Sequence, residues 1–379
     1  MMIKNWRQLA PFLHRTAVIY NTRNGYPTAH GVLESRLNSN QRASFTTDRK
    51  KDSVLDRLKA GDVLVGDGGM TFCLEKRGYV KAGPWSPECT VESPEAVRQV
   101  HREFLRAGAD IIQAFTFSMD DEIIDEKNDE INQAACDLAK GVAQEGGVFS
   151  AGSICQTAKL YAQGAGKERI QKRFEEQIAI FLKNDMDLLI AEVGKRQSRQ
   201  LAFMLISDSG SLSGADIIGV NCKFDPTTSM EALRLMKEAL DKEGHNPYLM
   251  IQPVGYHTPD AGRVGFASLP EIPFALEPRT LTRWDVHKYA RRAYDMGVRY
   301  IGGCCGFEPY HIRAIAEELA PERGFLPVAS EKHELWGGAL KNHPKEWMRR
   351  KANRAYWENL EPATGRPYSA ATSKFDGPA

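Results

Sequence analysis

The chain has 379 residues, of which 42% are apolar and 26% charged, and its formal net charge at pH 7 is +1. This length and composition predict a globular protein with one large α/β domain and extensions. The balanced charge gives no argument for binding nucleic acid or a membrane surface, and no apolar run approaches the ~18 residues of a transmembrane helix. Because the seven cysteines occur without a secretory signal, we expect a reducing compartment and metal-binding or catalytic thiols rather than disulfides.

Residues 1–50 differ in composition from the rest of the chain. They carry eight Lys and Arg residues against two acidic residues, Glu34 and Asp48, and they show no sustained periodicity. We expect a basic, disordered leader outside the catalytic domain and a cytoplasmic protein. An Arg-rich segment with few acidic residues is also typical of a mitochondrial transit peptide, which is the alternative.

One pattern recurs along the chain: the end of a helix, a glycine or polar turn, and an apolar strand that ends in small or polar residues. It occurs over residues 58–67, 105–113, 181–192, 212–219 and 293–302, and two further strands are expected over 147–152 and 248–253. Strands that alternate with helices predict a parallel sheet, and repetition over roughly 240 residues favours a (β/α)8 TIM-type barrel over an open doubly wound sheet. In such barrels, polar residues at the C-terminal ends of strands line the active site, and here these are Asp67, Gln113, Glu192, Cys222, Gln252, Cys304 and Cys305.

The pattern breaks over residues 193–214. Leu201–Ser207 has the composition of another apolar strand, but only about seven residues separate it from the strand-like segments on either side, whereas a parallel crossover needs about a dozen. Either this run is helical and seven strands are recognisable, or two covering helices are absent. We therefore expect a barrel that is possibly incomplete around residues 193–214.

Three cysteines follow two of these apolar strands. Cys222 ends the first, and the second ends in Gly302-Gly303-Cys304-Cys305-Gly306. Adjacent cysteines rarely bridge each other, because their Cα atoms lie only ~3.8 Å apart, and the glycines allow a sharp turn and a close approach. Three thiols at two strand ends suggest a metal site with one open position, although their spacing is equally compatible with buried small hydrophobic residues or a redox pair. The remaining cysteines have no comparable context and are interpreted as structural; they are Cys73, Cys89, Cys136 and Cys155.

Extended motifs give the chain a resemblance to the homocysteine S-methyltransferase family over residues 55–376. These motifs are Gly66–Gly69, Leu74–Trp85, Gly219–Cys222 and Gly302–Pro309. The resemblance implies a (β/α)8 barrel in which Cys222, Cys304 and Cys305 bind Zn²⁺. It also implies that a methyl group passes from betaine to homocysteine, giving methionine and dimethylglycine. Thiolates are the nucleophilic form of thiols, and zinc supplies the acidity that forms one, so no side chain is expected to act as a general base in the transfer.

The resemblance also assigns the residues that bind the two substrates. Asp67 and Gly68 correspond to the turn that binds homocysteine, and Glu192 to the carboxylate that holds its ammonium group. Trp85 corresponds to the aromatic side chain that faces the trimethylammonium group of the donor, and Gln113 and Gln252 are expected to bind the methyl donor and orient the substrates. Each residue also has a structural alternative. Asp67 could simply form a tight turn, Glu192 a surface ion pair, and Trp85 a packing contact, and the two glutamines could satisfy backbone groups.

Two departures from the family concern the methyl donor. Ser118 and Val193 stand where the betaine-using members carry tyrosines, and the loop over 119–130 is shorter. These differences keep S-methylmethionine as an alternative donor. A selenol or another thiol as the methyl acceptor also stays open, as does a catalytically impaired zinc-binding variant of the family.

The aromatic C-terminal residues predict a third unit after the homocysteine-binding barrel of residues 51–326. Residues 327–379 resemble the oligomerisation arm of the family, and aromatic residues suit an interface core. They are equally suited to pack back on the barrel; the aromatics are Trp336, Trp347, Tyr356 and Trp357. We expect a homo-oligomer, namely a tetramer.

Overall fold

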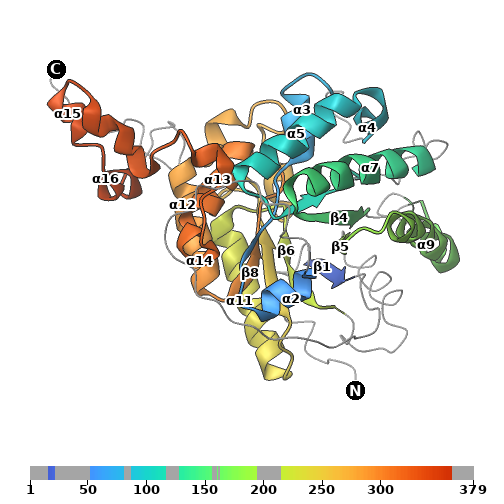
Figure 1. Cartoon of the computed structure of the whole chain (residues 1–379). Helices are drawn as coiled ribbons and strands as arrows, with labels where there is room; N and C mark the ends of the chain where they lie inside the picture. The colour runs from blue at the N-terminus through green and yellow to red at the C-terminus, as the bar shows by residue number, and fades with distance from the viewer. Residues whose placement is uncertain are drawn as a thin grey trace, which may run out of the picture.

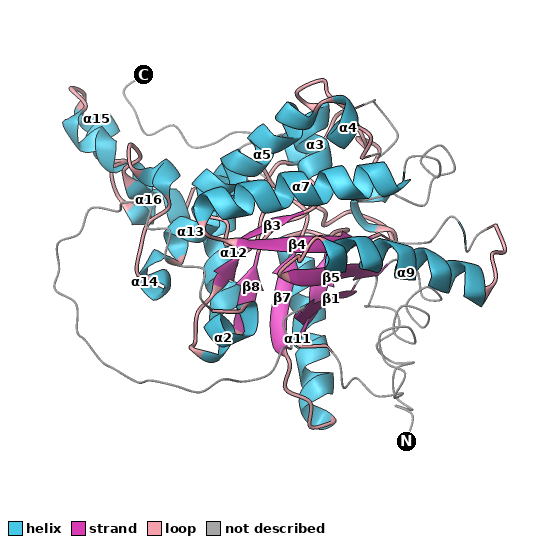
Figure 2. Ribbon diagram, turned by 45° about the vertical axis from the view of Figure 1, so that its right-hand side comes forward, coloured by secondary structure: helices cyan, strands magenta, loops and turns pink. Residues whose placement is uncertain are grey.

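The computed structural model describes residues 16–21, 52–80, 87–116, 128–155, 160, 163–193 and 215–360. In this part of the chain, helices surround an eight-stranded sheet of order β2-β8-β7-β6-β1-β5-β4-β3 (Figures 1 and 2). The strands are β1 (Thr16–Asn21), β2 (Leu64–Val65), β3 (Ile111–Gln113), β4 (Phe149–Ile154), β5 (Leu188–Val193), β6 (Ile217–Asn221), β7 (Tyr248–Gln252) and β8 (Val298–Ile301).

The described helices alternate with these strands. Those of the α/β units are α2 (Val54–Lys59), α5 (Pro94–Ala107), α7 (Asn128–Gly146), α9 (Lys167–Lys183), α11 (Pro226–Lys242), α12 (Arg283–Asp295) and α13 (Pro309–Glu318). The shorter ones are α3 (Met70–Glu75), α4 (Cys89–Glu92), α14 (Ala320–Arg323), α15 (Glu346–Arg349) and α16 (Arg354–Glu358). Every strand pair that does not involve β1 is parallel. The predicted alternation of helices with parallel strands is therefore confirmed.

Helix α5 illustrates how the sequence forms these units. Pro94 occupies its first turn, where a missing N–H costs nothing. Its buried residues include Val97, Val100 and Phe104, spaced three or four apart so that they face the sheet together. The helix ends at Gly108, whose φ of +106° is left-handed and whose Cβ, if present, would lie 2.7 Å from Ala316 Cβ.

Strand β1 departs from the sequence prediction. We expected residues 1–50 to be disordered, but Thr16–Asn21 form a strand that lies between β5 and β6 and is antiparallel to both. Figure 2 shows β1 beside β5 in the middle of the sheet. The break in the pattern lies between β5 and β6, so β1 occupies the place where a strand was expected to be lost. The rest of residues 1–50, and Leu201–Ser207, lie outside the described residues.

Buried aspartates tie neighbouring strands together at their N-terminal ends. Asp110, immediately before β3, donates its N–H to the Val65 carbonyl of β2 at 2.7 Å and accepts the Val65 N–H through its carboxylate at 2.9 Å. Asp187, immediately before β5, accepts the Ser150 N–H of β4 at 2.9 Å. The carboxylate of Asp110 also pairs with buried Arg323 at 3.0 Å, which compensates the cost of burying its charge. The first and last strands of the sheet order are therefore hydrogen-bonded through Asp110.

The aromatic C-terminal residues pack on α12. The Trp284 ring in α12 stacks with the rings of Trp336 and Trp357, with centroids 5.0 Å and 5.1 Å away. Arg354 of α16 lies over the Trp336 ring at 4.5 Å, a cation–π contact. This part of the predicted arm therefore packs back on the α/β units. Its role in a tetramer stays a prediction, and residues 361–379 lie outside the described residues.

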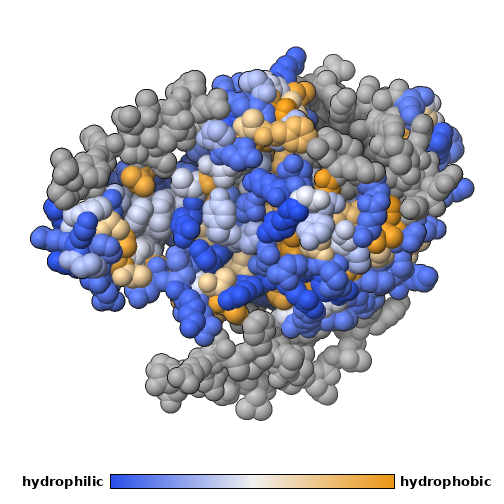
Figure 3. Space-filling view, turned by 90° about the horizontal axis from the view of Figure 1, so that it is seen from above, coloured by the Kyte–Doolittle hydropathy of each residue, from blue (hydrophilic) through white to orange (hydrophobic). Residues whose placement is uncertain are grey.

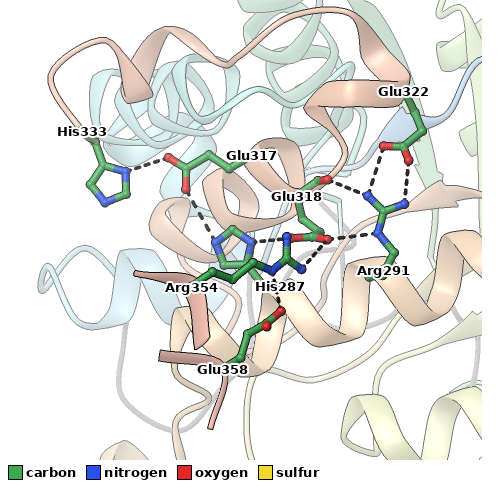
Figure 4. Close-up of polar contacts among 8 residues, drawn as sticks. All are labelled: His287, Arg291, Glu317, Glu318, Glu322, His333, Arg354 and Glu358. Carbon is green, nitrogen blue, oxygen red and sulfur yellow. Dashed lines mark hydrogen bonds and ion pairs between the residues drawn. The ribbon is translucent and has the colours of Figure 1, made fainter. Parts of the chain in front are cut away.

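An ion-pair network joins the same segment to α13. Figure 4 shows His287 of α12 between the carboxylates of Glu317 and Glu318. Its Nδ1 lies 3.2 Å from Glu318 and its Nε2 3.7 Å from Glu317. Arg291 pairs with Glu318 at 3.0 Å, and Arg354 pairs with the same carboxylate at 3.3 Å. Two arginines therefore compensate the buried charge of Glu318, which is the condition for burying it.

The outer surface is mostly polar. On the face seen in Figure 3, hydrophilic residues predominate and hydrophobic ones form small, separate patches among the residues that carry colour. The large apolar side chains that are exposed include Tyr79, Leu182 and Phe274. Among the described helices, none has the length and hydropathy needed to cross a membrane.

Candidate active site

The three predicted cysteine ligands come together at one end of the sheet. The sulfur atoms of Cys222, Cys304 and Cys305 all lie within 4.8 Å of one another, and those of Cys222 and Cys305 are 3.7 Å apart. A zinc ion with Zn–S bonds of about 2.3 Å and tetrahedral angles places its sulfur ligands about 3.8 Å apart. All seven cysteines lie in the described residues, and none forms a disulfide. The spacing therefore fits zinc.

Backbone conformation directs the thiol of Cys222 to this point. Cys222 directly follows β6, and its N–H donates to the Gln252 carbonyl of β7 at 2.7 Å. Cys222 and Lys223 have φ values of +56° and +65°, a left-handed conformation that costs residues with a Cβ roughly 1–2 kcal/mol each. Non-glycine residues keep such conformations where the surrounding structure determines them, most often at functional sites.

The glycines around Cys304 and Cys305 are required by close packing. A Cβ on Gly303 would lie 2.0 Å from the ring of Phe307, and one on Gly69 would lie 2.7 Å from the Cys304 carbonyl oxygen. The Cys304 N–H donates to the Pro253 carbonyl at 2.8 Å, and the Cys305 carbonyl accepts from Gly255 at 2.8 Å. Both cysteines are thus held against the end of β7 by backbone hydrogen bonds.

The chemistry of the three thiols also fits a metal. Hydrogen bonding with Cys222, and then with Cys305, raises the pKa of Cys304 well above its ordinary value. Three neighbouring thiolates repel each other, so all three can ionise together only when a cation neutralises them. The residues present therefore suit a divalent metal and leave one tetrahedral position for a further ligand.

A cavity of about 320 Å³ opens next to the thiols. It brings together most of the residues that the sequence predicted for the site, namely Asp67, Gly68, Gln113, Glu192, Gln252, Cys222, Cys304 and Cys305. Trp85 and Ser118 lie outside the described residues, and of Val193 only its place at the end of β5 is described. The cavity thus joins the predicted metal ligands to the predicted homocysteine residues.

Hydrogen bonds link the acidic residues of the cavity. The Gln113 N–H donates to Asp67 at 2.9 Å, and its side-chain Nε2 donates to Glu192 at 2.8 Å and to Ser153 at 2.9 Å. Burial raises the pKa of Asp67 to about 7, and the charge of Glu192 adds to this shift, while the hydrogen bond from Gln113 opposes it. Two carboxyl groups on one side of the cavity create a place for a cation. Gln113 orients Glu192, and its predicted contact with the donor stays a prediction.

Gln252 lines the cavity with a side chain that is almost fully buried. Its side chain is 3% exposed, and its Nε2 donates to the Tyr300 hydroxyl at 3.3 Å. Its Oε1 has no partner within the described part of the chain, and buried amide oxygens normally accept a hydrogen bond. An acceptor position therefore remains at the floor of the cavity, beside the backbone carbonyl that holds Cys222.

The sequence analysis missed several residues of the site. Ser153 lies in β4, and the expected end of that strand fell one residue too early to include it. Phe72 and Phe266 line the cavity beside Cys222 and pack edge-on at 6.3 Å between ring centroids. Lys223 is the one basic residue among the described residues that line the cavity. Phe72 and Phe266 lie outside the repeated strands, so no periodic signal identified them.

Comparisons with known proteins agree with this site. The sequence profile of the family "Homocysteine S-methyltransferase" matches residues 64–205 and 194–319. Betaine–homocysteine S-methyltransferase 1 of Bos taurus is 50% identical over 363 residues, which cover 86% of this chain and 89% of the relative. S-methylmethionine–homocysteine S-methyltransferase of Pongo abelii is 52% identical over 354 residues, covering 86% and 97%.

A solved structure supports the fold. The metallated homocysteine methyltransferase MmuM of Escherichia coli aligns with a TM-score of 0.51 and 18% identity, covering 68% of this chain and 96% of its own. At this identity the likeness concerns the fold alone. The two parts of the profile match overlap over residues 194–205, in the segment where the repeated pattern breaks. The profile and the relatives together place the chain in the homocysteine S-methyltransferase family.

Proposed function

We propose that this protein is a zinc-dependent S-methyltransferase that moves a methyl group from betaine to homocysteine and gives methionine and dimethylglycine. The observation that carries the proposal is one cavity in which three thiols at zinc spacing face two carboxyl groups, those of Asp67 and Glu192. An amino acid with a thiol presents the matching groups, because its ammonium suits the carboxylates and its sulfur suits the metal.

The three cysteines would hold the zinc, with Cys222 supplied by β6 and the adjacent pair by the turn after β8. When bound, zinc lowers the pKa of the homocysteine thiol, so that the nucleophilic thiolate is present at neutral pH. The protein then has no proton to remove during methyl transfer, which explains why no histidine lines the described cavity.

Binding and orientation are the tasks of the remaining side chains. Glu192, held by Gln113 at 2.8 Å, attracts the ammonium group of homocysteine, and buried Asp67 adds a second carboxyl group. Gly68 lines the cavity with its backbone, and packing requires a glycine there because a Cβ would lie 2.5 Å from the Phe307 carbonyl oxygen. Phe72 and Phe266 exclude water beside the thiols, which strengthens the electrostatic attraction inside the cavity.

The proposal extends to the scaffold and the assembly. We propose that the sheet closes into a TIM-type barrel with β1 as one of its eight strands, and the hydrogen bonds of Asp110 to β2 support this. A homotetramer in the cytoplasm remains part of the proposal. Trp336 and Trp357 pack on α12 of the same chain, so the support for the assembly is Trp347, a residue type enriched at interfaces.

S-methylmethionine is the second candidate donor. The relative named for this donor is 52% identical to the chain, and the relatives named for betaine are equally similar. Ser118 and Val193, where the betaine-using members carry tyrosines, favour it further. A donor pocket without those hydroxyl groups and rings has less to hold a trimethylammonium group.

Purified, zinc-loaded protein incubated with homocysteine and either donor tests the proposal. Methionine measured by mass spectrometry should form with at least one donor, and the ratio of kcat/KM values decides between them. Zinc bound to the protein without methionine from either donor would instead support the catalytically impaired variant. Protein that binds no zinc would overturn the proposed function.

A further inference from the structure

Strand β1 makes a complete set of backbone pairs in the middle of the sheet. Each of its six residues pairs with β5, from Thr16 opposite Val193 to Asn21 opposite Leu188. On its other side, Thr16 pairs with Val220 and the register continues to Ile19 opposite Ile217. β1 lies outside residues 64–319, to which the family profile matches. Strand β1 is therefore an addition to the unit that the profile matches, and it lies in the middle of the sheet of that unit.

The chain between β5 and β6 is too short to supply a further parallel strand here. Residues 194–216 connect the two, whereas an intervening parallel strand would need two crossovers of about a dozen residues each, besides the strand itself. Among the described strands, only β1 pairs with the facing edges of β5 and β6. Leu188, Ile190 and Ile217 are fully buried, and each unpaired buried backbone group costs about 1–3 kcal/mol. Something must pair with these edges.

The position of β1 bears directly on the active site. β5 carries Glu192 and β6 leads into Cys222, and Ala17 lies opposite both Glu192 and Gly219. Neighbouring strands lie about 4.8 Å apart, so one strand between β5 and β6 separates them by about 9.6 Å instead of 4.8 Å. Glu192 and Cys222 both line the cavity. The width of the cavity between them is therefore set by whether β1 is present.

We propose that residues 16–21 act as a positioning strand that replaces the strand lost between β5 and β6 and sets the spacing of Glu192 and Cys222. Residues 16–21 are then part of the catalytic unit rather than of a removable extension. The inference relies on the proposed function for its kinetic test only. Its structural test is independent of any activity.

Paired cysteines test the register. Val18 lies opposite Ile218, and residues directly opposite in an antiparallel pair have Cα atoms about 4.5–5.5 Å apart, within the range of a disulfide. In zinc-loaded protein under a mild oxidant, Val18→Cys with Ile218→Cys should form a bridge that peptide mass spectrometry identifies. Ile19→Cys with Ile218→Cys is the control, because a shift of one residue turns the side chain to the other face. Tyr20→Cys with Leu189→Cys repeats the test on β5, where these residues lie opposite each other.

A bridge in the paired variants and none in the shifted control supports the inference. Bridges in neither, or equally in both, overturn it, because β1 then has no fixed place between β5 and β6. Direct pairing of β5 with β6 is the structural alternative. It predicts a bridge between Ala191→Cys and Ile218→Cys, which β1 would keep apart.

Kinetics test the positioning role. Val18→Pro removes a backbone donor from a strand that is paired on both sides, and kcat/KM for homocysteine should fall at least about tenfold. Val18→Thr keeps the donor and should restore the wild-type value, and Ser39→Pro outside β1 should leave it unchanged. The bridged 18–218 variant should remain active, since it fixes β1 in place. Equal activity of Val18→Pro and wild type would overturn the inference. If the 18–218 disulfide forms but wild-type protein is inactive, the inference still holds and the proposed function is wrong.

Discussion

The two sides of the active site are built in different ways. On one side, Cys304 and Cys305 lie in a turn whose packing and hydrogen-bond partners are adjacent in sequence or follow directly after β2 and β7. On the other side, Glu192 and Cys222 are placed by β5 and β6, and in the described part of the chain the strand that joins these two is β1. The turn is formed by residues close in sequence and should tolerate changes elsewhere in the chain. The side formed by β5 and β6 depends instead on β1, which is distant in sequence. Changes to the two sides should therefore have different consequences.

Loss of a metal ligand should have the largest effect. Cys305→Ser removes one of three thiolates, so zinc content and methionine formation should both fall more than about 100-fold, beyond the 10–100-fold typical of changes around a metal's ligands. Cys136→Ala is the matched control, because Cys136 is buried in α7 away from the cavity. If Cys305→Ser kept both zinc and activity, the assignment of the metal ligands would be wrong.

Removing the charge on the β5 side should affect substrate binding more than the metal. Glu192→Gln loses a charge-assisted contact worth about 1.5–3 kcal/mol, which corresponds to a rise in KM for homocysteine of roughly 10- to 100-fold. Zinc content should stay at the wild-type level. Glu145→Gln changes an exposed ion pair with Arg102 and should alter neither value. A fall in zinc content for Glu192→Gln would show that the two sides are not independent.

A methyl group in the glycine turn should destabilise this side of the active site. Gly303→Ala places a Cβ 2.0 Å from the Phe307 ring, and overpacking of this kind costs typically 1–3 kcal/mol of unfolding free energy. Gly141→Ala in α7 is the control, since its nearest neighbour, the Arg98 guanidinium, is 3.7 Å away, and it should stabilise the helix by about 0.5–1 kcal/mol. Denaturant unfolding distinguishes the two. Equal stabilities would mean that the turn is not tightly packed.

The pH dependence should identify Asp67. Its pKa is raised to about 7 by burial, so the charge that attracts an ammonium group is lost as the pH falls through 7, and KM for homocysteine should rise. The effect on folding has the opposite sign. A carboxyl group whose pKa is raised in the folded state contributes stability below its unfolded pKa near 3.9, and that contribution is lost as the pH rises through about 7.

Asp67→Asn separates the two effects of Asp67. The gain in stability of Asp67→Asn over wild type should be larger at pH 8 than at pH 5. The KM of this variant for homocysteine should no longer change between these two pH values. Thermal unfolding and initial rates measure the two quantities. A KM that still rises below pH 7 in Asp67→Asn would assign the titration to another group.

The sequence predicted the side with the glycine turn well and the side formed by β5 and β6 poorly. Helix periodicity, glycine turns and strand-end polar residues located the strands and the three cysteines that come together, because each of these signals lies within a few residues. The same signals revealed the missing unit near 193–214. They could not reveal that Thr16–Asn21 fills its place, because strand pairing depends on contacts between residues far apart in the chain. Cavity residues such as Phe266 escaped for the same reason.

The state of zinc before and after homocysteine is added tests the central claim most directly. X-ray absorption of the zinc-loaded protein should give three sulfur ligands at about 2.3 Å and one lighter ligand. Addition of homocysteine should replace the lighter ligand with a fourth sulfur, because the substrate thiolate occupies the open position beside Cys222, Cys304 and Cys305. A spectrum that does not change on addition of homocysteine, or one with fewer than three sulfur ligands at the start, would contradict the account.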